Sequence, residues 1–265
     1  MQSIPESKRI LSLYEELIKR VIFTEKGPLR FNAKLLPASV IANQYYCEKK
    51  VELAYVYGEV EERAERIIGK ELHEELLKHA MKVRVEDILR KIFSGEFVIV
   101  REMLLIAEYK GVVVAGIPDA IAFDKGSPIY VFEYKFSKRT IPFRDYHVQT
   151  RLYCLLLNLM GFNTDNLRYA LIIAPLWCKD NEKSKIILRK IPMLISRLSI
   201  PPREPVKFGS ARVYIKDFKI DEALEELEWA IGFWKRERNA KPTSRVAKCR
   251  VCEYYDVCNS KPGNN

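Results

Sequence analysis

The segment GIPDAIAFDKGSPIYVFEYKF, residues 116–136, places charged side chains inside two runs that otherwise have the composition of buried β-strands. Side chains alternate between the two faces of a strand, so Glu133 and Lys135 share one face of the second run. The aromatic residues share the other face, which is the expected core. On the first run, Asp119 falls on a face that is otherwise apolar. An unpaired buried carboxylate is costly, so Asp119 requires a cation nearby.

A divalent metal ion between Asp119 and Glu133 would supply that cation, with the backbone carbonyl of Tyr134 as a further oxygen ligand. Lys135 would point to the same side, where an ammonium group can orient or deprotonate a water and neutralise charge on a phosphate. The alternative is an ion-pair cluster of the same side chains without a metal. The pattern therefore predicts either a hydrolytic metal site or a charged cluster.

The tripeptide Glu-Tyr-Lys also occurs at Glu108–Lys110. That copy adjoins Gly111 at an expected hairpin turn, and no aspartate lies on a strand just before it. We interpret it as turn decoration, and only the copy at residues 133–135 as a candidate site.

Periodicity assigns the rest of the chain to helices and strands. The three β-rich runs predict an antiparallel meander, Ser39 and Asp221 are expected helix caps, and Gly161 is an expected helix stop. Helices are predicted over 6–23, 39–53, 59–80, 85–93, 143–161 and 221–238, and strands over 97–109, 111–123, 127–136, 168–175 and 185–191.

Three regions are expected: an N-terminal helical region over 1–95, a core over 96–220 and a C-terminal helix with a cysteine-rich tail over 221–265. The proline-bearing segment 183–216 matches no assigned role and is a candidate oligomer or partner surface.

The composition points to a polyanionic partner. A chain of 265 residues that is 48% apolar can bury a sizeable core, and its net charge of +10 attracts nucleic acid, although an even scatter of solvated lysines gives the same total. No apolar run approaches the roughly 18 residues of a membrane span. We therefore expect a cytoplasmic protein with no membrane partner.

Three of the six cysteines, Cys249, Cys252 and Cys258, lie within ten residues of one another. Such a density in a reducing compartment favours a bound metal, and Cys47 is the natural fourth ligand because Cys154 and Cys178 lie in apolar runs. Four thiolates suit a zinc ion or a [4Fe-4S] cluster, and the spacing alone leaves both open.

The order Asp119, then Glu133-x-Lys135, resembles the PD-(D/E)xK nuclease superfamily. Gln149 and Tyr153, one helical turn apart on the next helix, resemble its RecB-like branch, in which the pair would contact DNA phosphate or the catalytic lysine. The alternative for the pair is that Tyr153 packs and Gln149 joins a local network. The resemblance implies that Asp119, Glu133 and Lys135 are catalytic.

Gly69-x-x-x-His73 also resembles the RecB-like branch, and the resemblance implies that His73 is a nitrogen ligand of a catalytic Mg²⁺ or Mn²⁺ ion. His79 and His147 match no motif and are expected to be ordinary residues. The implied fold is α/β: a restriction-endonuclease-like core with a mixed sheet flanked by helices, an N-terminal helical cap and a C-terminal iron–sulfur region.

One distant N-terminal cysteine with three at the C-terminus is similar to the iron–sulfur RecB-like nucleases, including the fourth family of CRISPR-associated proteins. This resemblance implies a [4Fe-4S] cluster on the four cysteines. It also implies a metal-dependent exonuclease that degrades single-stranded or overhanging DNA from 5′ to 3′ and trims prespacer ends beside CRISPR integrase proteins. Apart from the resemblance, the chain is a candidate homo-oligomer. The competing readings are a repair or recombination nuclease unrelated to CRISPR, and a DNA-binding scaffold with weak catalysis.

Overall fold

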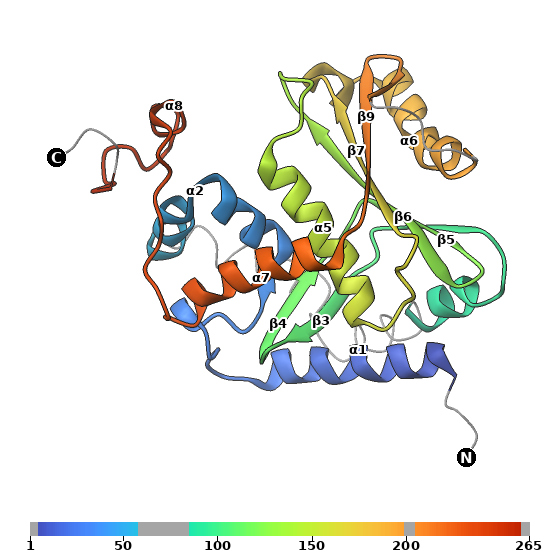
Figure 1. The fold of residues 1–265 in the computed structure, drawn as a ribbon, viewed down its shortest axis with the longest axis horizontal. Coiled ribbons are helices and arrows are strands. Elements are labelled where there is room, and N and C mark those ends of the chain that lie inside the picture. The colour runs from blue at the N-terminus through green and yellow to red at the C-terminus, as the bar shows by residue number, and fades with distance from the viewer. Residues whose placement is uncertain (1–4, 58–84, 199–204, 261–265) are drawn as a thin grey trace.

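The computed structural model describes residues 5–57, 85–198 and 205–260. Figure 1 shows helices packed on both faces of a twisted central sheet, with the C-terminal tail beyond α2. The helices are α1 (Glu6–Phe23), η1 (Arg30–Asn32), α2 (Ala38–Val56), α5 (Arg144–Leu159), η2 (Leu176–Lys179), α6 (Glu182–Ser196), α7 (Ile220–Trp234) and α8 (Val246–Cys249), and residues 85–92 are also helical. The strands are β1 (Leu36–Pro37), β2 (Val98–Arg101), β3 (Leu105–Tyr109), β4 (Val112–Gly116), β5 (Ala120–Asp124), β6 (Ser127–Phe136), β7 (Arg168–Ala174), β8 (Val206–Phe208) and β9 (Ala211–Asp217).

The strands form two sheets. The larger has the order β2-β5-β6-β7-β9-β8, with β6 and β7 parallel and the other pairs antiparallel, and the smaller has the order β1-β4-β3. Parallel neighbours need a crossover connection, and α5 supplies it between β6 and β7. The expected mixed α/β architecture with flanking helices is therefore present.

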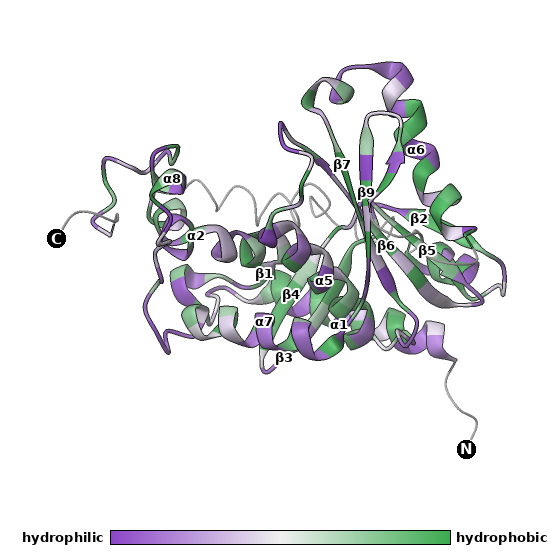
Figure 2. Cartoon of the chain, turned by 45° about the horizontal axis from the view of Figure 1, so that its top comes forward, coloured by the Kyte–Doolittle hydropathy of each residue, from purple (hydrophilic) through white to green (hydrophobic). Residues whose placement is uncertain are grey.

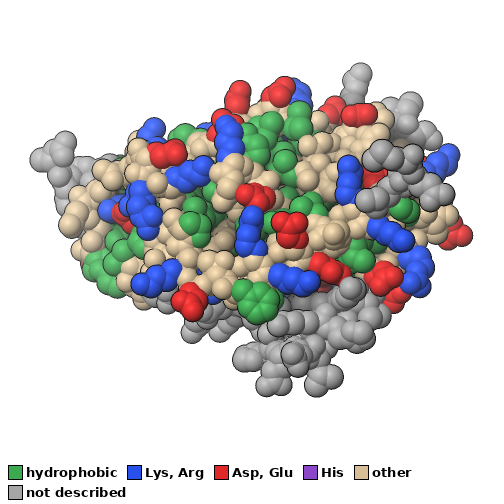
Figure 3. Space-filling view, turned by 90° about the horizontal axis from the view of Figure 1, so that it is seen from below, with side chains coloured by type: hydrophobic (Ala, Val, Ile, Leu, Met, Phe, Trp, Pro, Cys, Tyr) green, Lys and Arg blue, Asp and Glu red, His purple; other side chains and the backbone are tan. Residues whose placement is uncertain are grey.

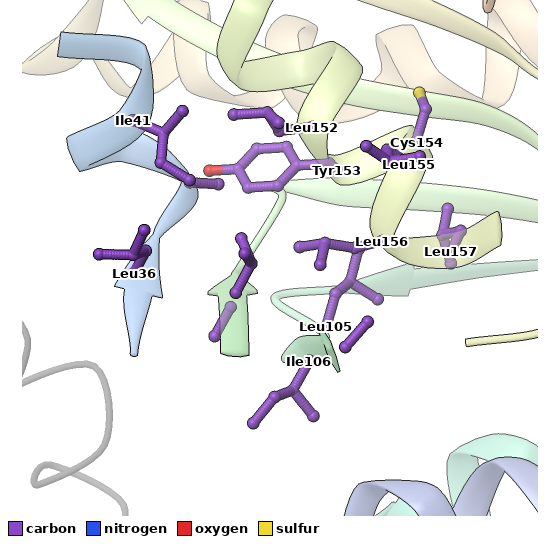
Figure 4. Close-up of a cluster of buried hydrophobic side chains, with 14 of the residues drawn as sticks. Leu36, Ile41, Leu105, Ile106, Leu152, Tyr153, Cys154, Leu155, Leu156 and Leu157 are labelled. Atoms are coloured by element: carbon purple, nitrogen blue, oxygen red, sulfur yellow. The ribbon is translucent and has the colours of Figure 1, made fainter. Parts of the chain in front are cut away.

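Apolar side chains fill both faces of the larger sheet. On one face α1, α2, α5, α7 and the smaller sheet share a continuous core, of which Figure 4 shows Leu36, Ile41 and Leu156. On the other face α6 covers a second cluster. Figure 2 shows the hydrophobic colour gathered on the strands and on the inward faces of the helices. Since Val131 and Phe132 are both buried, β6 packs on its two faces, whereas the sequence indicated a core on the aromatic face alone.

Two predicted strands are each broken, so the expected single meander is wrong. Glu102 has φ of 51° and ends β2, and β3 then joins the other sheet. The second predicted strand is interrupted over 117–119, where Pro118 has no N–H to donate to a ladder. Asp119 therefore lies on the connection between the two sheets and not within a strand.

The predicted strand over 185–191 is wrong, because this segment lies within α6. The side chain of Asn181 accepts a hydrogen bond from the Ser184 N–H at 2.9 Å and caps the helix. Leu188, Ile191 and Ile195 then meet the sheet at helical spacing, so a run that looked like a strand is the apolar side of a helix. The β8–β9 hairpin that follows was not predicted.

The remaining helices differ from expectation mainly at their ends. α1 matches its predicted range, and Gly161, with φ of 98°, follows the end of α5 as expected. The Ser39 and Asp221 caps are each wrong by two positions, because α2 starts after Pro37 and α7 after Lys219. α7 ends at Trp234, four residues early. The helix predicted over 59–80 lies outside the described residues.

Within the described ranges, none of the helices is both long enough and apolar enough to cross a lipid bilayer.

Candidate active site

Three parts of the fold bring the predicted catalytic side chains together. Asp119 comes from the connection between β4 and β5, Glu133 and Lys135 come from β6, and Gln149 comes from α5. In the β5–β6 ladder, Ala120 pairs with Phe132, so the residues just beyond this pair, Asp119 and Glu133, are neighbours. The crossover then lays α5 over the same face of the sheet.

Asp119 is held by the backbone of the next strand. Its Oδ2 accepts a hydrogen bond from the Tyr134 N–H at 2.7 Å. Burial raises the pKa of the Asp119 carboxyl, while this hydrogen bond and the interaction with Glu133 oppose the rise. Asp119 is thus fixed in position and close to a second acid.

Glu133 is the more perturbed of the two acids. Its side chain points away from solvent, with only 5% of the residue exposed. Burial, and then the negative charge of Asp119, raises the pKa of Glu133 to about 8 against the pull of Lys135, whose Nζ lies 2.8 Å from Glu133 Oε1. Two adjacent carboxylates in such a place need a shared proton or a cation. This geometry suits a divalent ion.

Gln149 joins the acid and the lysine. Its Oε1 accepts from Lys135 Nζ at 2.8 Å, and its Nε2 donates to Glu133 Oε1 at 3.1 Å and to the Tyr153 hydroxyl at 2.6 Å. Since Gln149 and Tyr153 are four residues apart on α5, one helical turn stacks them. Glu133 and Gln149 therefore fix the position of the Lys135 ammonium group.

Tyr153 is only 3% exposed. Its ring, labelled in Figure 4, packs within the core, and a Cβ on Gly116 would lie 2.9 Å from Cδ1 of this ring and closer still to Cε1. Gly116 therefore makes room for Tyr153. The burial fits a positioning role for Tyr153 better than direct contact with DNA, which corresponds to the packing alternative. DNA contact by Gln149 stays a prediction.

Tyr134 contributes its backbone to the site while its side chain lies on the opposite face. Its hydroxyl donates to the Leu188 carbonyl in α6 at 2.9 Å, and burial raises the pKa of Tyr134 to about 12. The role of its carbonyl as a metal ligand stays a prediction.

The other predicted metal ligand, His73, lies outside the described residues. Among the residues that are described, no group of three or more His, Cys, Asp or Glu side chains is placed to hold a metal ion. Glu102, which was not singled out in the sequence, raises the pKa of Asp119 through its charge, so it lies near the site. Its unusual backbone at the end of β2 gave no signal in the sequence.

Of the residues set aside in the sequence, Glu108, Lys110 and His147 make ordinary contacts, and His79 lies outside the described residues. Glu108 pairs with Arg20 at 2.6 Å, and Lys110, with φ of 49°, lies in the turn between β3 and β4. His147 lies 3.1 Å from the Tyr169 hydroxyl, and burial lowers its pKa to about 4. The second Glu-Tyr-Lys therefore lies at the β3–β4 turn, as predicted.

The four clustered cysteine positions surround one pocket. Cys47 has φ of −167° and ψ of 113°, which interrupts α2 and turns this residue out of the helix. Cys249, Cys252 and Cys258 from the tail line the same pocket, and the Thr243 N–H donates to Cys47 Sγ at 3.4 Å. Cys154 and Cys178 are buried elsewhere in the cores, as expected.

A buried acid next to Cys47 anchors the tail. Glu48 is 0% exposed and accepts from the Arg238 guanidinium at 2.5 and 2.9 Å and from the Lys241 N–H at 2.7 Å. Gln44 Nε2 donates to the same carboxylate at 2.6 Å and its Oε1 accepts from Trp234. We call this set the Glu48 clasp. The clasp was not predicted, because Glu48 is one of several charged residues in its helix and has no distinguishing pattern in the sequence.

Comparison with known proteins supports the family. The model of the PD-(D/E)XK nuclease superfamily matches residues 19–259. No curated protein matches the chain at a significant level. The crystal structure of SSO0001 aligns over 98% of this chain and 99% of the other, with 14% identity and a TM-score of 0.42. With a family match across most of its length, the chain belongs to the PD-(D/E)XK nuclease superfamily.

Proposed function

We propose that the protein is a metal-dependent exonuclease that hydrolyses single-stranded or overhanging DNA from the 5′ end. The observation that carries the proposal is the adjacent pair Asp119 and Glu133, with the pKa of Glu133 raised to about 8 and Lys135 2.8 Å away. Buried acids with raised pKa beside a lysine are costly as structural elements and are typical of catalytic sites.

Asp119 and Glu133 would hold Mg²⁺ or Mn²⁺, with His73 and the Tyr134 carbonyl as the further expected ligands. When bound, the ion would lower the pKa of a water and polarise the scissile P–O bond. Lys135, held by Glu133 and Gln149, would place its positive charge where negative charge develops on the phosphate. Tyr153 would keep Gln149 in position.

The four cysteines would hold a [4Fe-4S] cluster. They surround a common pocket, and the N–H of Thr243 that points at Cys47 Sγ is the kind of donor that tunes cluster sulfurs. A single zinc ion requires all four sulfurs at about 2.3 Å from one point, whereas a cluster is wider. Among the described residues no three cysteines are placed to hold a metal ion, so the choice of the cluster over zinc rests on the resemblance to the iron–sulfur nucleases.

The cluster is tested by absorbance near 400 nm and by iron and zinc content. Cys249→Ser is expected to lose the absorbance, whereas the control Cys154→Ser, a buried packing position, keeps it. Stoichiometric zinc without the absorbance would contradict the cluster and leave the nuclease proposal intact.

The cellular role belongs to the same proposal: a cytoplasmic homo-oligomer that trims prespacer ends together with CRISPR integrase proteins. This role rests on the resemblance described above. A repair nuclease with the same active site is the alternative, and the genes adjacent to this one distinguish the two.

The activity is tested with single strands labelled at the 5′ or 3′ end, in Mn²⁺, Mg²⁺ or EDTA. The double variant Glu133→Gln/Lys135→Gln is expected to lose activity by about 10²-fold or more. The matched control is Glu108→Gln/Lys110→Gln, the same substitutions in the surface copy of the tripeptide, and it is expected to keep full activity. Wild-type protein that binds the strands and degrades none of them with either metal would favour the scaffold.

A further inference from the structure

A large groove lies between the candidate active site and the cysteine pocket. It encloses about 900 Å³, near the upper end of the usual range of ligand sites, about 300–1,000 Å³. Its walls come from α2, the start of α5, α7 and the tail around residues 241–251. Figure 1 shows these three helices side by side, with the tail crossing beyond α2.

The groove is rich in positive charge. Five cationic side chains line it against three carboxylates, and one of those carboxylates, Glu226, is already paired with Arg151. Arg139, Arg144 and Lys241 are exposed there. On the face drawn in Figure 3, by contrast, basic and acidic side chains are interspersed over the described atoms. The lining of the groove therefore carries a net positive charge.

Aromatic rings alternate with these cations. The Arg144 guanidinium lies 4.8 Å from the centre of the Tyr45 ring, and the Arg139 guanidinium lies 5.9 Å from that of Phe143. The Phe143 ring is 37% exposed. Cations along a backbone path with rings on which bases stack are the features of single-strand binding sites.

The groove leads to the catalytic lysine. Phe143 precedes the first residue of α5, and its ring centre lies 5.4 Å from that of Tyr146. The Lys135 Nζ lies 5.3 Å from the centre of the same Tyr146 ring. Tyr146 therefore links a residue of the groove to a residue of the candidate active site.

We propose that this groove is the track along which a single DNA strand runs to the active site, with Arg139, Arg144, Lys241 and Arg245 on its phosphates and Phe143 stacked on a base. The proposal rests on the nuclease function proposed above and adds the path of its substrate. An acidic protein partner would also be attracted to the cations, but it would have no need of the exposed ring.

The test is the binding of a fluorescent 12-nucleotide single strand, followed by anisotropy in metal-free buffer so that no cleavage occurs. Arg144→Gln/Lys241→Gln is expected to lower the slope of log affinity against log salt by about 1.4, since each phosphate contact on a single strand contributes about 0.7. Phe143→Ala is expected to bind about fivefold or more weakly with an unchanged slope.

Matched controls come from the opposite side of the larger sheet. Lys183→Gln/Lys190→Gln removes the same charge from exposed positions on α6, and Trp177→Ala removes an aromatic residue that is 56% exposed. Both controls are expected to bind like wild type. Thermal melts of all variants show that each is folded.

Two results separate this proposal from the proposed function. If wild type degrades DNA with metal, but the groove variants bind with unchanged affinity and salt slope, the track is wrong and the nuclease stands. If the groove variants lose binding as expected while no metal gives degradation, the track stands and the nuclease proposal fails. Equal losses of DNA affinity in the α6 controls would mean that binding follows the total charge of the protein, and would overturn the proposed track.

Discussion

Replacing Glu133 with Gln is expected to make the metal-free protein more stable while removing its activity. The folded protein keeps a proton on Glu133 up to a pKa of about 8, whereas the unfolded chain releases it near the ordinary value of 4.5. Between these two values the unfolded state is favoured increasingly as the pH rises, because it binds fewer protons. Below pH 4.5 both states are protonated and the penalty is absent.

The size of the effect follows from the shift. At pH 7 the folded chain keeps Glu133 protonated, whereas the pH lies about 2.5 units above the pKa of Glu133 in the unfolded chain. Ionisation of Glu133 therefore stabilises the unfolded state by about 3 kcal/mol, at 1.36 kcal/mol per unit. A chain of this length changes its Tm by roughly 2–4 °C per kcal/mol, so the variant is expected to melt about 6–12 °C above wild type at pH 7. At pH 4.5 the two melting temperatures should nearly coincide.

The assay is a series of thermal melts from pH 4.5 to 8 in metal-free buffer, repeated with Mn²⁺. Because the two proteins share every other titrating group, including the buried His147, their difference isolates Glu133. Mn²⁺ should raise the Tm of wild type and not of the variant. Glu108→Gln, which removes a partly exposed ion pair, is the control and should shift the Tm little at any pH. A gap between Glu133→Gln and wild type that is constant with pH would refute the reasoning.

Two further predictions concern packing around the site. Gly116→Ala would push its methyl group into the Tyr153 ring and so displace Gln149. The variant is expected to lose about 1–3 kcal/mol of stability and at least tenfold in activity. Wild-type kinetics in this variant would show that the packing of Tyr153 does not position the lysine. Glu48→Gln leaves the half-buried Arg238 without its charged partner and is expected to lower the free energy of unfolding by about 1–3 kcal/mol, measured by urea titration. An unchanged midpoint would show that the clasp contributes nothing.

The active-site grouping could be predicted because its signals are local. Glu133 and Lys135 follow from strand alternation, and Gln149 and Tyr153 from helical spacing. These residues come together because the antiparallel pair β5–β6 is followed directly by the crossover helix α5. The catalytic roles themselves rest on the resemblance and stay predictions.

The failures have a common physical cause. A short apolar run such as 185–191 has the same composition on a helix and on a strand, and only the cap at Asn181 and the long-range packing decide between them. The breaks at Glu102 and Pro118 assign neighbouring strands to different sheets, which depends on contacts far along the chain. The Glu48 clasp is likewise a meeting of residues about 190 positions apart.

The place of Asp119 between the two sheets has a consequence for how the enzyme would fail on heating. One of the expected ligands sits on the chain that crosses from one sheet to the other, and its companion sits inside the larger sheet. A slide of one sheet against the other would therefore strain this connection and the hydrogen bond from the Tyr134 N–H that holds Asp119 beside Glu133. Activity in such a protein would depend on the alignment of its two sheets, so heating should abolish activity at a lower temperature than it unfolds the chain.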